Sequence, residues 1–176
     1  MIFRHAEAET SSVDIIREAK PSDARGIINC MQSVMDERVF LVGEYYMWTE
    51  KGEQDRIRNP DDLTVVCQNG DSIVGVLTLQ RGYYRKNRHT AQLGIAVSAG
   101  HRHMGIGTKL ISYATDWARS RGIRKINLEV FSTNQNAIAA YRKLGFKVEG
   151  VRKNQFIIEG AYVDDVLMSL EFPDQG

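Results

Sequence analysis

The chain has 176 residues, of which 43% are hydrophobic and 26% are charged. This size and composition predict one soluble globular domain over residues 1–176, with a frayed N-terminus at 1–11. The 23 basic and 22 acidic residues leave a net charge of +1, which excludes a general electrostatic attraction to nucleic acid or to an anionic membrane. We therefore expect neither nucleic acid nor a membrane among its partners.

The cysteines and the apolar runs indicate the compartment. Cys30 and Cys67 lie in apolar surroundings, with no CxxC spacing and no nearby histidine. Buried, reduced thiols are therefore expected in place of a disulfide or a metal site. No apolar run approaches the length of a membrane span, and residues 1–10 lack an apolar core. These features predict a cytoplasmic protein with no bound metal.

The first half of the chain predicts a strand, a helix and two hairpins. A strand is expected at 13–17, and Pro21-Ser22-Asp23 caps a helix that extends to Met35. The stretch 40–59 is rich in aromatic and charged residues without clean periodicity, and we interpret it as a second, less regular helical region. Alternating runs then predict strands at 63–67, 73–79 and 90–97, joined by turns at Asn69-Gly70 and 82–87.

The second half predicts strands that alternate with helices. The apolar run 93–97 suits a central strand buried on both faces, and Gly94 within it is typical of a bulge or a close approach. Next come a glycine-bearing loop, a helix closed by Gly122, a strand, a short helix and a terminal hairpin that turns at Glu159-Gly160. This order predicts a mixed α/β fold, in which helices cover both faces of a mostly antiparallel, twisted sheet of about six to seven strands.

The loop before the long helix has the features of an anion site. A helix start leaves backbone N–H groups without intrahelical acceptors, and the helix dipole favours an anion there. Gly105 and Gly107 lack the Cβ atoms that would keep a diphosphate from the backbone, and Arg102 adds a positive charge. A Walker loop requires Gly-Lys-Ser/Thr, whereas this chain has Gly107-Thr108-Lys109. Taken alone, the pattern also fits a solvated glycine turn.

Two segments resemble signatures of the GCN5-related N-acetyltransferases. Ile95-Ala96-Val97, followed by Arg102 to Thr108, is similar to that family's acetyl-CoA-binding motif. The segment from Asn134 to Phe146 is similar to the downstream signature, with asparagine, alanine, tyrosine and Gly-Phe in register. The resemblance implies the acyl-CoA N-acyltransferase fold, with acetyl-CoA as cosubstrate. It implies these cofactor-binding residues: Ile95, Ala96, Val97, Arg102, His103, Met104, Gly105, Ile106, Gly107, Thr108, Asn134 and Tyr141.

The resemblance also implies direct transfer of acetyl to a primary amine in a ternary complex. The leaving thiolate, with a free pKa of ~8.5, requires a proton donor, and Tyr141 matches the family's general acid. An amine with a pKa of ~10.4 must lose a proton, for which the family often has a glutamate on the central strand. This sequence departs from that pattern with Gln92. Glu129 on the next strand is a candidate base, and a surface salt bridge is its competing interpretation.

The acceptor amine is not defined by any motif. Glu44 and Tyr45 are candidate substrate-binding residues, because an acid attracts a cationic amine and an aromatic ring stacks on it. Core packing explains the aromatic residues of this segment equally well. The Gln92 departure leaves a non-catalytic acyl-CoA-binding regulatory module as the alternative function. Dimerisation is common in the family, and a homodimer through the terminal hairpins stays open.

Overall fold

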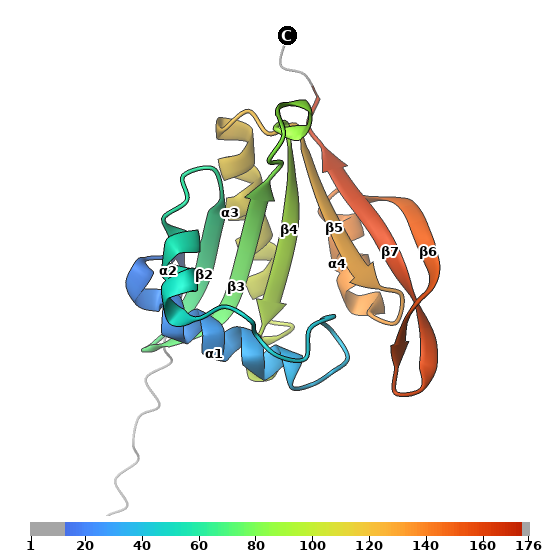
Figure 1. Ribbon diagram of the computed structural model, residues 1–176, viewed down its shortest axis with the longest axis horizontal. Coiled ribbons are helices and arrows are strands. Elements are labelled where there is room, and N and C mark those ends of the chain that lie inside the picture. The colour runs from blue at the N-terminus through green and yellow to red at the C-terminus, as the bar shows by residue number, and fades with distance from the viewer. Residues whose placement is uncertain (1–12, 174–176) are drawn as a thin grey trace, which may run out of the picture.

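The computed structural model describes residues 13–173, so the frayed start expected at 1–11 lies outside the described residues. Seven strands form one sheet in the order β1-β2-β3-β4-β5-β7-β6 (Figure 1). The strands are β1 (Asp14–Glu18), β2 (Leu63–Asn69), β3 (Ser72–Arg81), β4 (Thr90–Val97), β5 (Lys125–Phe131), β6 (Lys147–Ile158) and β7 (Ala161–Glu171). The α-helices are α1 (Ala24–Met35), α2 (Glu50–Ile57), α3 (Ile106–Ser120) and α4 (Gln135–Lys143).

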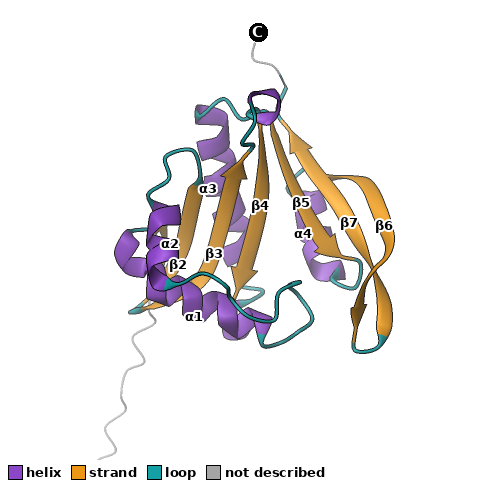
Figure 2. Ribbon diagram, viewed as in Figure 1, coloured by secondary structure: helices purple, strands orange, loops and turns teal. Residues whose placement is uncertain are grey.

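Helices cover both faces of the sheet, as the sequence predicted. Helices α1 and α2 lie on one face, and α3 and α4 on the other (Figure 2). Alternate side chains of a strand enter opposite layers, which explains why the first five residues of β2 are all buried. Val65 and Cys67 belong to the core cluster that contains Leu110 of α3, whereas Val66 packs with Ile27 of α1.

Strands β4 and β5 form the parallel pair of a sheet whose other pairs are antiparallel. Their pairing is limited to Thr90–Gln92 against Lys125–Asn127, after which the two strands diverge (Figure 1). The expectation that the apolar run of β4 is buried on both faces is wrong, because Gln92 and Gly94 are exposed beside this opening. The register of β3 with β4 is continuous, so Gly94 does not mark a bulge.

The stretch 40–59 is less helical than expected, because within it only α2, Glu50–Ile57, forms an α-helix. Long-range side-chain contacts hold the irregular part. Gln32 of α1 accepts a hydrogen bond from the Tyr46 amide at 2.9 Å. The Tyr46 hydroxyl donates to the fully buried Glu53 at 2.7 Å, and Arg56 also donates to this carboxylate at 2.8 Å. Burial and the Glu53 hydrogen bond raise the pKa of Tyr46.

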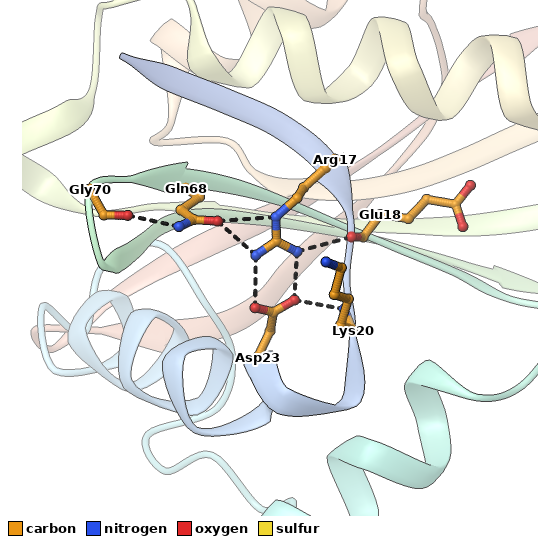
Figure 3. Close-up of polar contacts among 6 residues, drawn as sticks. All are labelled: Arg17, Glu18, Lys20, Asp23, Gln68 and Gly70. Carbon is orange, nitrogen blue, oxygen red and sulfur yellow. Dashed lines mark hydrogen bonds and ion pairs between the residues drawn. The ribbon is translucent and has the colours of Figure 1, made fainter. Parts of the chain in front are cut away.

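Arg17 joins β1, β2 and the turn before α1 (Figure 3). Its guanidinium donates to both carboxylate oxygens of Asp23, at 2.7 and 2.9 Å, and to the Gln68 side-chain oxygen at 2.8 and 3.1 Å. The Lys20 amide also donates to Asp23, at 2.6 Å. These hydrogen bonds lower the pKa of Asp23, with the Arg17 contact as the largest cause.

The predicted turns and thiols are confirmed. Gly122 follows α3 with φ of 70°, and the β6–β7 turn has Glu159 at φ 50° and Gly160 at φ 80°. These left-handed values suit a helix end and a two-residue hairpin turn. Cys30 and Cys67 are buried and free. Among the described residues, no helix is long and apolar enough to span a membrane.

Candidate active site

A cavity of about 390 Å³ lies where β4 and β5 diverge. Its walls come from the end of β4, the loop and first turn of α3, β5, α4 and the segment after α1. Most residues predicted for the cofactor and the chemistry line it: Ile95, Ala96, Val97, Arg102, His103, Gly105, Ile106, Gly107, Thr108, Glu129, Asn134 and Tyr141. Met104 is outside this lining and is 58% exposed.

The start of α3 presents free backbone amides to the cavity. Gly105 precedes the helix with φ of 80°, and the Lys109 amide donates to its carbonyl at 3.1 Å. The amides of Ile106, Gly107 and Thr108 therefore precede the first intrahelical bond and have no acceptor within the helix. A Cβ atom at Gly105 would meet nothing within 4 Å, and one at Gly107 would meet only the Ile95 Cδ1 atom at 3.9 Å. This open, N–H-lined surface fits a diphosphate.

Arg102, predicted to add a positive charge to the anion site, makes its contacts with the protein itself. Its Nε donates to the Val97 carbonyl at 2.9 Å, and its two terminal nitrogens donate to the two oxygens of Glu37 at 2.8 and 2.5 Å. The guanidinium also lies over the Phe40 ring, 4.4 Å from its centroid. Glu37 thus compensates the charge of Arg102, whose direct contact with a phosphate stays a prediction.

Two signature residues of α4 face the same cavity. Asn134 is the N-cap, and its side-chain oxygen accepts from the Ala137 amide at 3.3 Å. Tyr141 is 8% exposed and packs beside Phe146, with ring centroids 5.8 Å apart. Burial raises the pKa of Tyr141 to about 12, because the phenolate would lose its hydration. The phenol therefore retains its proton at neutral pH.

A second cavity, of about 430 Å³, lies beside the β4–β5 pairing and is lined by residues that include Gln92, Asn127 and Arg152. Glu129 and Leu128 line both cavities. Glu129 also makes the predicted salt bridge, because Arg152 lies 3.1 Å from its carboxylate.

Arg152 is shared between two carboxylates, since it also donates to Asp165 at 2.7 Å. Asp165 is 1% exposed, and burial raises its pKa above the usual value although the Arg152 hydrogen bond opposes this shift. The buried Asp165 carboxylate thus holds Arg152 in place, and Arg152 in turn holds the Glu129 carboxylate. Sequence reasoning missed this anchor, because Asp165 lies in a β-alternating run with no catalytic motif.

The structure does not bring Glu44 and Tyr45 to the cavity. Tyr45 is 70% exposed, Glu44 is exposed, and neither lines either cavity. The segment after α1 instead contributes Phe40 and Leu41. In the sequence, two adjacent large apolar residues after a charged turn were the signal that could have indicated this cavity wall. Within residues 13–173, no cluster of His, Cys, Asp and Glu side chains suits a metal ion.

A diverging parallel strand pair beside a glycine-bearing helix start forms an anion site at the mouth of a cavity, which is the arrangement that the resemblance to acyl-CoA-dependent transferases implies. Comparisons with known proteins agree with this class. The sequence profile of the Acetyltransferase (GNAT) family matches residues 28–146. The L-amino acid N-acetyltransferase AaaT of Escherichia coli K12 is 32% identical over 129 residues, which are 70% of this chain and 75% of that protein. The chain belongs to the GNAT family, and it is an acetyl-CoA-dependent N-acetyltransferase.

Solved structures have the same fold. A GNAT-family acetyltransferase from Streptococcus pneumoniae superimposes with a TM-score of 0.86 and 27% identity, covering 92% of this chain and all of that one. The protein yncA from Salmonella typhimurium, solved with its cofactor acetyl-CoA, superimposes with a TM-score of 0.83 and 19% identity, covering 94% of this chain and 97% of that one. The predicted fold class is confirmed.

Proposed function

We propose that acetyl transfer takes place at the β4–β5 opening, where acetyl-CoA and a small primary amine approach from different cavities. The observation that carries the proposal is that Glu129 lines both cavities, together with Leu128. In this arrangement the 390 Å³ cavity holds the pantetheine arm, with the diphosphate on the amides of Ile106, Gly107 and Thr108. The amine enters through the 430 Å³ cavity.

Tyr141 is proposed as the general acid. As the amine nitrogen bonds to the acetyl carbon, the carbon–sulfur bond breaks and the electron pair stays on sulfur. The Tyr141 phenol then donates its proton to that sulfur, and the medium restores the proton to tyrosine. A pKa raised to about 12 keeps the donor protonated, and burial within the cavity wall excludes competing water.

Glu129 is proposed as the base that takes the amine proton, directly or through one water. Gln92 is paired with Asn127 at the last step before the strands diverge. Glu129 is two residues beyond Asn127 and therefore lies on the same face of β5, at the opening. Glu129 of β5 thus supplies the carboxylate, whereas β4 has only the side-chain amide of Gln92. Arg152 orients this carboxylate.

The acceptor is proposed to be cationic before it loses its proton. Around the second cavity, Arg152 lies between Glu129 and Asp165, and Lys125 between Glu149 and Glu171. Of these groups, Lys125, Arg152, Glu129 and Glu149 line the cavity, and Glu129 and Glu149 are the carboxylates that an incoming ammonium group would meet there. The relative AaaT, named for L-amino acids, supports a small-molecule acceptor.

The test is thiol release from acetyl-CoA with a panel of primary amines. Wild-type protein should release coenzyme A with at least one small amine, and Glu129→Gln should lower kcat by roughly 100-fold or more. Glu149→Gln removes a carboxylate that lines only the second cavity, and should raise KM for the amine while kcat is retained. Binding of acetyl-CoA without thiol release from any amine would instead support the non-catalytic module.

A further inference from the structure

Arg102 ties together three parts of the chain that are distant in sequence. It belongs to the cofactor loop, and its guanidinium packs over the Phe40 ring. The same guanidinium donates to both the Glu37 carboxylate and the Val97 carbonyl. Its side chain is 23% exposed and that of Glu37 is 28% exposed, so the forked pair is largely withdrawn from water. Such a bidentate arrangement fixes both distance and orientation.

The partners of Arg102 lie at the turn after α1. The Glu37 amide bonds to the Val34 carbonyl at 3.3 Å, and Arg38 has a left-handed φ of 60° that redirects the chain. Phe40 and the neighbouring Leu41 then line the 390 Å³ cavity. A displacement of Glu37 would therefore move one wall of the cavity as well as the loop that carries Arg102.

We propose that Glu37 is a positioning residue for acetyl-CoA, which acts through Arg102 to hold the cofactor loop and the segment 37–41 at a fixed separation. The proposal rests on the proposed function of that loop. Three donors of Arg102 are occupied by Glu37 and Val97. Arg102 thus supports binding by shaping the backbone cradle, and the amides of that cradle contact the diphosphate.

The opposite assignment makes a prediction of opposite sign. If Arg102 were itself the diphosphate ligand, Glu37 would compete with the diphosphate for the same guanidinium. Removal of the Glu37 charge would then release Arg102 and tighten binding. A positioning role predicts weaker binding, because the cradle loses its support. The sign of the change therefore separates the two assignments.

The first experiment is calorimetric titration of coenzyme A into purified full-length variants. Glu37→Gln should weaken binding roughly tenfold, and Phe40→Leu should weaken it less, since it removes the aromatic contact but retains an apolar side chain. Asp116→Asn on α3 removes the same charge at a side chain that is 75% exposed, and should bind as wild type does. Unchanged or tighter binding by Glu37→Gln would overturn the proposal.

The second experiment needs no ligand and no turnover, so it is independent of the proposed function. Amide hydrogen exchange of free Glu37→Gln should accelerate together in 37–45 and in 98–105, because the ion pair joins these segments. Asp116→Asn should leave both segments unchanged. Acceleration confined to 37–45 would contradict the proposal, even if coenzyme A bound more weakly. Absence of thiol release in wild type would instead refute only the proposed function.

Discussion

Comparison of Gly105→Ala with its matched control, Gly122→Ala, is expected to separate the effect of backbone strain from the effect on ligand binding. Both glycines have left-handed φ values, 80° and 70°, and a Cβ atom at either would meet nothing within 4 Å. Each substitution therefore introduces the same backbone strain, about 1 kcal/mol, without a steric clash. Only Gly105 lines the cavity, whereas Gly122 ends α3 outside that lining.

The affinity for coenzyme A should change only in the first variant. A Cβ at Gly105 faces the open surface where we place the diphosphate, and it would displace one charge-assisted hydrogen bond of about 1.5–3 kcal/mol. The dissociation constant should then rise roughly ten- to hundredfold. Gly122→Ala should retain the wild-type constant despite an equal loss of stability.

The assay combines thermal unfolding with calorimetric titration of coenzyme A. Both variants should unfold about 2–4 °C below wild type, which is the shift expected for 1 kcal/mol in a chain of this size. Titrations are performed well below both transitions, so that strain does not reduce the folded fraction. Equal affinities in the two variants would refute the diphosphate cradle at the start of α3.

Three further outcomes are expected. Tyr141→Phe should lower kcat about 100-fold or more with an unchanged dissociation constant for coenzyme A, measured by thiol release and calorimetry. Arg17 lowers the pKa of Asp23, so this carboxylate stabilises the fold above its unfolded pKa, and the contribution is lost as the pH falls through the lowered folded pKa. In urea unfolding, the free energy of unfolding of Asp23→Asn should therefore fall less towards acid pH than that of the wild type. Burial raises the pKa of Cys67 to about 11 and also raises that of Cys30, so a thiol reagent at pH 8 should label neither before denaturant is added.

The elements that the sequence predicted well are specified by neighbouring residues. Glu159-Gly160 forms the predicted two-residue turn, and Gly122 ends a helix by its own backbone freedom. The hairpin predicted at Asn69-Gly70 turns one residue later, at Gly70 and Asp71, because Asn69 still pairs with Ser72. The cofactor loop is equally local, since Arg102 to Gly107 spans six positions of the chain, with Gly105 directly before α3 and Gly107 in its first turn. Such features need no information about distant segments.

The parts that the sequence did not predict depend on partners far along the chain. The path of residues 37–49 depends on hydrogen bonds from Tyr46 to Gln32 and to Glu53. The buried Glu53 carboxylate accepts from both Tyr46 and Arg56, which compensates for its loss of hydration. The Glu37–Arg102 pair spans 65 residues and follows no periodicity. Aromatic and charged composition alone therefore indicated a pocket at Glu44 and Tyr45, which the folded chain leaves exposed.

The proposed mechanism depends on strand divergence, and the pairing of the outer strands explains how divergence is tolerated. β4 keeps seven paired positions with β3, and β5 keeps seven with β7, while the two share only three with each other. Each strand is thus held on its far side, so opening the near side leaves backbone groups facing a cavity without loosening either strand. The backbone groups of 93–96 on that side are available to a bound pantetheine arm, whereas the Val97 carbonyl accepts from Arg102. Longer pairing of β4 with β5 would satisfy them internally, close the passage at Glu129, and separate the amine from the thioester.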